Sequence, residues 1–252
     1  EEVPTTTIQL RIPAGQTRES IGKLGVASIT ASMLEENTLK STSEELSNQL
    51  QKLGSSVSFG VADKFTTLRI RTLSKNIDPT LAIAMERLTS PKFDAADFER
   101  LKKQQIEGLK NAKKNASSMA TEIFSKLVFG YDNSFAHSNS GTIATVEKLT
   151  LEDVKAFYTA NYGPANAEVI VVSNVNSESM TKHLQALNNW TGQSSQMPVL
   201  KAFPALAAGT LYFIDKPEAA QSEIRIGKRA LNYDATGEYY CFLSSTSYAV
   251  LE

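Results

Sequence analysis

Side chains that commonly bind metals are scarce in this sequence. Among its 252 residues are one cysteine, Cys241, and two histidines, His137 and His183. A single cysteine excludes an internal disulfide and any zinc or iron–sulfur site built from several cysteines. Cys241 lies between Tyr240 and Phe242, a setting typical of a buried, unreactive thiol. The histidines are far apart and in no metal-type spacing, so we expect no metal and no cofactor in this chain.

An excess of charge and long hydrophobic runs are also missing. The 26 lysines and arginines are balanced by 27 aspartates and glutamates, which argues against a nucleic-acid partner. No apolar run approaches the roughly 20 residues of a membrane-spanning helix, so we expect no membrane segment. Apolar residues make up 41% of the sequence and are spread along it, which indicates a soluble, folded protein rather than a disordered one.

Both ends of the sequence have the features of a piece cut from a longer polypeptide. The chain opens at Glu1-Glu2-Val3-Pro4 without a methionine, and residues 251–252 are Leu-Glu, a common cloning scar. An apolar helical pattern runs up to Val250 without a terminating signal. We therefore expect residues to be missing beyond both ends.

Strand and helix patterns alternate along the first three quarters of the chain. Alternating apolar and polar residues predict strands at 6–12, 56–62 and 66–73, and the apolar run 168–173 predicts a strand in a sheet interior. Helical spacing and end signals predict helices at 23–36, 41–53, from 76 to the break at Pro91, and at 94–111, 119–129, 150–162 and 177–187. This order predicts an α+β fold with helices packed on a mostly antiparallel or mixed sheet.

A change in composition divides the chain. Residues 193–209 are rich in Gly, Ser, Gln, Pro and Ala without periodicity, and they predict a linker. We expect residues 1–192 to form one α+β domain. Strand patterns at 210–215 and 222–228 and a helical pattern from 237 predict that residues 210–250 begin a second, truncated domain of the same kind.

Several short segments, weak singly but specific in their order and spacing, resemble the pitrilysin/insulinase family of zinc metallopeptidases. They are Gly25-Val26-Ala27, Leu53-Gly54-Ser55, Thr150-Leu151-Glu152-Asp153-Val154, Tyr162-Gly163-Pro164-Ala165-Asn166-Ala167 and Asp215-Lys216-Pro217. The resemblance covers essentially the whole chain. It implies two homologous halves, each of two α+β domains, that close around a peptide, with His-x-x-Glu-His on a helix of the catalytic half.

At the place of that motif this sequence has none of its chemistry. The resemblance places Ser28 and Ser32 where the two zinc-binding histidines would stand and Ala31 where the general base would stand. Glu107, on the helix 94–111, lies within a residue or two of the place of the third ligand. These four positions are therefore interpreted as degenerate, with no catalytic residue and no bound metal.

The resemblance implies a non-catalytic half that completes the peptide chamber, with zinc in the catalytic half of the parent protein. Its expected partners are that catalytic half, in the same or another chain, and peptide substrates. An alternative is a structural or assembly subunit, or a pseudo-subunit like those of the processing peptidases, with no proteolytic role of its own. The similarity to large bacterial members implies a periplasmic or cell-envelope location.

Overall fold

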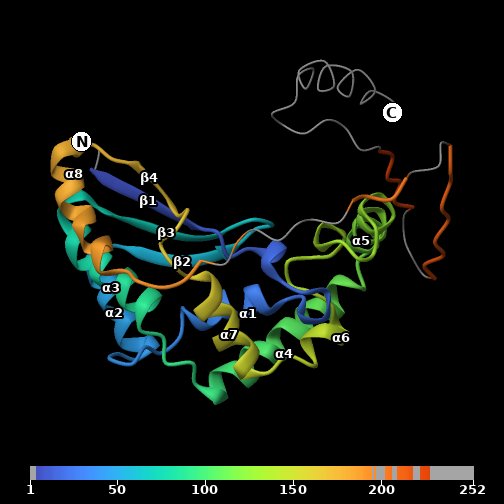
Figure 1. Ribbon diagram of the computed structural model, residues 1–252, viewed down its shortest axis with the longest axis horizontal. Helices are drawn as coiled ribbons and strands as arrows, with labels where there is room; N and C mark the ends of the chain where they lie inside the picture. The colour runs from blue at the N-terminus through green and yellow to red at the C-terminus, as the bar shows by residue number, and fades with distance from the viewer. Residues whose placement is uncertain (1–3, 195, 197–201, 206–208, 218–221, 228–252) are drawn as a thin grey trace.

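The computed structural model describes residues 4–194, 196, 202–205, 209–217 and 222–227. Within them, antiparallel strands form a sheet in the order β2-β3-β1-β4 (Figure 1). The strands are β1 (Thr5–Ile12), β2 (Ser56–Val61), β3 (Thr66–Leu73) and β4 (Glu168–Val172). β1 lies inside the sheet, with Ile8 opposite Ile70 of β3 and Val171 of β4. The predicted α+β fold with a mostly antiparallel sheet is confirmed.

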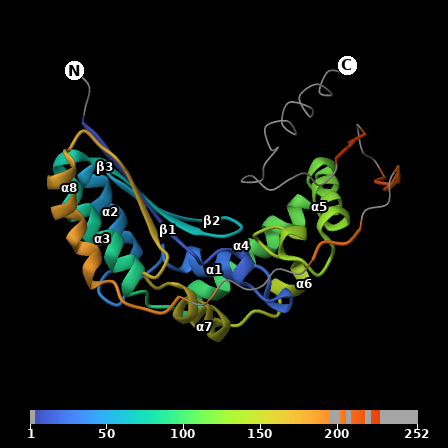
Figure 2. The same cartoon turned by 45° about the horizontal axis from the view of Figure 1, so that its top comes forward.

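Helices cover one face of this sheet, and the other face is open (Figure 2). The α-helices are α1 (Val26–Met33), α2 (Ser43–Leu53), α3 (Ile77–Thr89), α4 (Ala95–Ala112), α5 (Ala116–Phe129), α6 (Ile143–Val146), α7 (Leu151–Asn161) and α8 (Ser177–Leu184). Short 3-10 helices occur at Gln16–Arg18, Ile21–Lys23, Ser74–Asn76, Ser134–Ala136 and Gln185–Asn189. The open face carries exposed polar side chains such as Ser58, Arg69 and Arg71.

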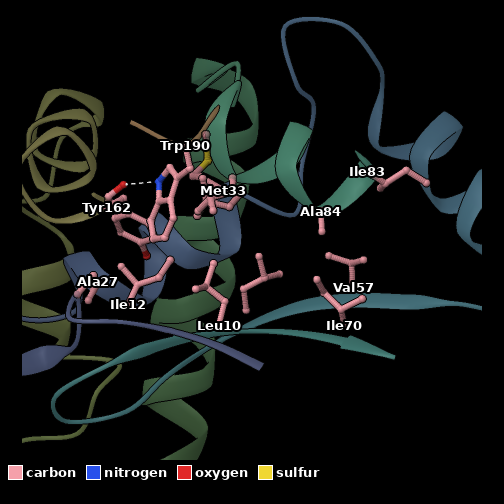
Figure 3. Packing of buried hydrophobic residues seen from close by; sticks show 14 of the residues in the cluster. Leu10, Ile12, Ala27, Met33, Val57, Ile70, Ile83, Ala84, Tyr162 and Trp190 are labelled. Atoms are coloured by element: carbon pink, nitrogen blue, oxygen red, sulfur yellow. Dashed lines mark hydrogen bonds between the residues drawn. The ribbon is translucent and has the colours of Figure 1, made fainter. Parts of the chain in front are cut away.

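The core lies between the sheet and the helices that cover it. Leu10 and Ile12 of β1 and Ile70 of β3 point toward Met33 of α1 and Ala84 of α3 (Figure 3). In the same layer, beside Met33, the indole Nε1 of Trp190 donates a hydrogen bond to the Tyr162 carbonyl oxygen at 3.0 Å (Figure 3). All buried residues of the core cluster precede residue 191 in the chain.

α1 is shorter than predicted, because its start is fixed by the backbone. Gly25 adopts a left-handed conformation, with φ of 96°, immediately before the helix. The Glu19 carboxylate accepts hydrogen bonds from the N–H groups of Gly25 and Ala27 and so caps the helix. Residues 21–23 form a separate 3-10 turn instead of the first turn of the helix predicted from residue 23.

The prediction that the apolar strand at 168–173 lies inside the sheet is wrong. β4 is an edge strand, and Val169, Ile170 and Val172 are 40%, 45% and 70% exposed. An apolar run shows that a segment forms a strand, but it does not specify how many neighbours the strand has. The interior place belongs to β1, whose strict alternation of polar and apolar residues reflects its one buried face.

The described residues of the C-terminal quarter depart from the predicted strands. Residues 210–215 and 222–227 pair with no strand in the part of the chain that the structure describes, and Leu211, Phe213 and Ile226 are about nine-tenths exposed. Phe203 stacks edge-on against Phe129 at the end of α5, with 5.4 Å between ring centroids. The helix predicted from residue 237, Cys241 and the Leu-Glu end lie outside the described residues.

Candidate functional site

A cavity of about 470 Å³ opens between α1, α4, the edge strand β2 and the loop 138–140. Its apolar wall includes Phe59 and Val61 of β2 and Leu101 and Leu109 of α4. Its polar wall consists of hydroxyl and amide side chains, namely Ser28, Ser32, Gln104, Gln105, Ser138, Asn139 and Ser140. The cavity is therefore neutral, with many hydrogen-bonding groups and no charged side chain in its lining.

The structure brings together three of the four site residues predicted from the sequence. Ser28, Ala31 and Ser32 all line the cavity from α1, because positions separated by three or four residues share one helix face. The Ser28 hydroxyl donates a hydrogen bond to the Asn139 carbonyl oxygen at 2.8 Å. Ala31 is 3% exposed and contributes only its methyl group.

Glu107, the fourth predicted residue, does not line the cavity. On α4 the lining residues are Leu101, Gln104, Gln105, Gly108, Leu109 and Ala112. Glu107 forms an exposed ion pair with Lys110 at 2.9 Å, and this hydrogen bond with the lysine holds the pKa of the carboxyl below its usual value. The α4 positions that face Ser28 and Ser32 across the cavity therefore carry amides, a glycine and apolar side chains.

Four consecutive carbonyl groups of the loop 137–140 accept hydrogen bonds from side chains, and two of the three donors, Gln16 and Gln105, were not assigned to the site from the sequence. Gln16 Nε2 donates to the carbonyl oxygens of His137 and Ser138 at 2.9 and 3.0 Å. Ser28 donates to Asn139, and Gln105 Nε2 donates to Ser140 at 2.8 Å. Of the two unassigned donors, only Gln105 could have been found from the sequence, because its amide stands among the apolar residues on the inner face of α4.

The cavity is a poor fit for zinc. Zinc sites in proteins use imidazole, thiolate and carboxylate ligands, and this lining offers serine hydroxyls and side-chain amides. His137 does not line the cavity, and its Nε2 lies 2.7 Å from the Tyr131 carbonyl oxygen. His183 pairs with Asp78 at 2.5 Å, which links α8 to α3. Among the described residues no group of three or more His, Cys, Asp or Glu side chains could hold a metal ion.

Fold and cavity together define a class of α+β domain in which helices cover one face of an antiparallel sheet and a neutral cavity lies between α1, α4 and β2. The model of the insulinase family, peptidase family M16, matches residues 1–135 of the chain, and the model of the peptidase M16 inactive domain matches residues 148–244. The chain thus belongs to the M16 (insulinase) peptidase family.

Relatives with known names or structures agree with this assignment. A zinc protease of Helicobacter pylori, PqqE, is 26% identical over 202 residues, which cover 74% of this chain and 43% of that protein. The crystal structure of a peptidase M16 inactive domain from Pseudomonas fluorescens matches with a TM-score of 0.73 at 21% identity, over 81% of this chain and 49% of the other.

A third likeness is to the first half of the periplasmic protease PqqL from Escherichia coli, with a TM-score of 0.69 at 17% identity. It covers 78% of this chain and 44% of the other. The chain spans about half the length of the curated relatives it matches. Among the described residues, none of the helices has the length and apolar character needed to cross a membrane.

Proposed function

We propose that this chain is the non-catalytic half of a zinc metallopeptidase, which completes the chamber around a peptide and contributes to peptide binding. The observation that carries the proposal is the composition of the α1 cavity. Ser28, Ala31 and Ser32 share one wall of the cavity. None of these three side chains can bind zinc or activate a water molecule. The zinc of the parent protein would therefore lie in its catalytic half.

Two findings support this reading over a self-sufficient enzyme. Relatives that the chain matches are named zinc proteases, and the chain spans about half of their length. A second half is then needed for both the metal and the enclosed chamber. The name of the periplasmic relative PqqL supports a periplasmic location, which cell fractionation of the tagged parent protein would test.

A cleavage assay separates this function from its alternatives. The chain alone is incubated with a library of quenched fluorescent, unstructured peptides, with and without added zinc, and we expect no cleavage in either case. Addition of the separately purified catalytic half should produce zinc-dependent cleavage. Zinc-dependent cleavage that copurifies with this chain alone would overturn the proposal. Failure of the catalytic half to gain activity from this chain would favour a structural or assembly subunit.

A further inference from the structure

The edge strand β2 is bonded on both sides, although it pairs with only one strand. Along an antiparallel strand, the backbone N–H and C=O groups of successive residues point alternately toward the paired strand and away from it. In β2 one alternate set is Ser56, Ser58 and Gly60, and the other is Val57, Phe59 and Val61. The backbone groups of the second set point away from β3, because Val57, Phe59 and Val61 each form one backbone hydrogen bond with a side chain from outside the sheet.

These three contacts come from three different elements. The Glu35 carboxylate, just after α1, accepts from the Phe59 N–H at 2.6 Å. The Arg87 guanidinium of α3 donates to the Val57 carbonyl oxygen at 3.1 Å, and the Asn139 amide donates to the Val61 carbonyl oxygen at 3.2 Å. An unoccupied edge would present these same groups to an incoming strand. Here each of them already has a partner from the same chain.

Ser28 holds one of these contacts in place. Its hydroxyl donates to the Asn139 carbonyl oxygen, while the side chain of the same Asn139 reaches Val61. The neighbouring carbonyls are fixed by Gln16 and Gln105, and Gly141 closes the loop with φ of 74° where a Cβ atom would lie 2.2 Å from the Leu24 carbonyl oxygen. The loop therefore has little freedom to withdraw from the edge.

From this arrangement we propose that Glu35, Arg87 and Asn139 close the β2 edge to the addition of a peptide strand, with Ser28 as a positioning residue for the Asn139 contact. A peptide that enters the neighbouring cavity meets side chains of Phe59 and Val61 and not a free backbone edge. The proposal goes beyond the function given above, and it applies equally if the chain is a structural subunit.

Opening the edge provides the first test. The probe is a fluorescein-labelled octapeptide of alternating threonine and valine, and its binding is measured by fluorescence anisotropy. We expect E35A/N139A to bind the probe about tenfold more tightly than wild type, a difference of about 1.4 kcal/mol, because the Phe59 N–H and the Val61 carbonyl oxygen both become free to bond to it. E35Q keeps an acceptor oxygen for the Phe59 N–H and should bind as wild type does. Equal affinity of a folded E35A/N139A and wild type would overturn the proposal.

A second test uses wild type and does not depend on how the double variant folds. Deuterium uptake at residues 56–61 is measured with and without excess probe, and we expect no change. Protection of the Val57 and Val61 amides by the probe would show that the edge is open and would overturn the proposal. The cleavage assay described above does not report on this edge, so the two proposals fail by different results.

Ser28 and Ser32 form a matched pair for the positioning role. Both line the cavity from α1, and the Ser28 hydroxyl bonds to the loop, whereas the Ser32 hydroxyl has no hydrogen-bond partner among the described residues. We expect S28A to raise deuterium uptake at residues 137–141 and to strengthen probe binding, and S32A to change neither. If S28A and S32A show the same deuterium uptake and the same probe affinity, Ser28 does not position the Asn139 contact.

Discussion

Glu19 is a carboxylic acid with almost no contact with water. It is 8% exposed, and its carboxylate accepts hydrogen bonds from the N–H groups of Gly25 at 3.1 Å and Ala27 at 2.7 Å. Burial raises the pKa of Glu19 to about 8, and the two backbone hydrogen bonds oppose that rise. The same group that caps α1 therefore makes the stability of the fold depend on pH.

The sign of this dependence follows from proton binding. Between the ordinary pKa of 4.5 and the raised value of about 8, the folded chain holds a proton on Glu19 that the unfolded chain has released. The contribution of Glu19 is thus fully present below pH 4.5 and is lost as the pH rises toward 8. We expect E19Q to remove this dependence, in which the free energy of unfolding falls by at most about 1.4 kcal/mol per pH unit as the pH rises. Urea unfolding of both proteins between pH 5 and 8 measures it, and identical slopes would contradict the assignment.

Residue substitutions at the α1 cavity can also introduce metal ligands. Histidines at positions 28 and 32 would share one helix face at the i, i+4 spacing that zinc sites use, and both positions line the cavity. We expect S28H/S32H to bind zinc at least about tenfold more tightly than wild type, a difference of roughly 1.4 kcal/mol. Isothermal titration calorimetry measures this, with S28H alone as the control. Stoichiometric zinc on the wild-type protein after a mild chelator wash would reveal a site elsewhere.

At the scale of single elements, helix ends were predictable only in part, since both ends of α2 were indicated, whereas the ends of α1, the start of α5 and the end of α8 differ from the predictions by about three residues. Thr42 caps α2 in a capping box with Glu45, and Gly54 ends the helix in a left-handed conformation, as the sequence around residues 41–54 indicated. The start of α1 was not predictable, because its capping group, Glu19, comes from outside the helix pattern. Local signals specify an end only when the capping residue is itself local.

The capping box gives a simple stability prediction. T42A removes the side-chain acceptor for the Glu45 N–H and should destabilise the protein by about 1 kcal/mol. S43A, one residue further along and with no side-chain hydrogen bond among the described residues, is the matched control and should change stability by less than about 0.5 kcal/mol. Chemical denaturation compares the two, and equal losses would contradict a specific capping role.

Trp190 fixes the segment that follows α8 to the body of the domain. The residue is 6% exposed, and its indole N–H donates a hydrogen bond to the Tyr162 carbonyl oxygen (Figure 3). We expect W190A to cost about 3–5 kcal/mol, and W190F, which keeps most of the packing, to cost about 1–3 kcal/mol through the lost hydrogen bond. Urea unfolding measures both values. A W190A protein as stable as wild type would show that the segment is not part of the core.

The sequence predicted the candidate site in part, for a physical reason. Ser28, Ala31 and Ser32 share a wall because helical spacing is local, whereas the α4 register could not be placed to within a residue and Glu107 points away. The contacts of Gln16 and Asn139 join segments far apart in the chain. No periodicity encodes such contacts, since they depend on how the loop 137–141 folds back over α1.

At the scale of the whole molecule, the buried core is built from residues up to Trp190, and the described residues of the C-terminal quarter add nothing to it. The buried cluster ends at Trp190, and the described residues 211–216 and 222–225 instead border a second cavity beside α5, with Ala116 and Met119 in its lining. A boundary near residue 192 stays a prediction. It agrees with the place where the core ends, although the inactive-domain model spans residues 148–244.

Truncation tests that boundary. We expect a chain of residues 1–194 to unfold in one cooperative transition, with a melting temperature within about 4 °C of the full chain, because a 1 kcal/mol loss shifts a domain of this size by roughly 2–4 °C. Circular dichroism measures both chains. Loss of the cooperative transition in the shorter chain would show that the later residues belong to the same folding unit.

The central position of β1 also determines when folding can finish. Thr7 of β1 pairs with Arg71 of β3 on one side and with Val172 of β4 on the other. During synthesis β1 leaves the ribosome before the other described strands, but its second neighbour, β4, is made only after all the described α-helices except α8. Pairing between such distant segments is slow, because a long loop must close first. Until β4 arrives, the growing chain displays an unpaired edge along Ile8 and Leu10, and this interval is when it most needs protection by a chaperone.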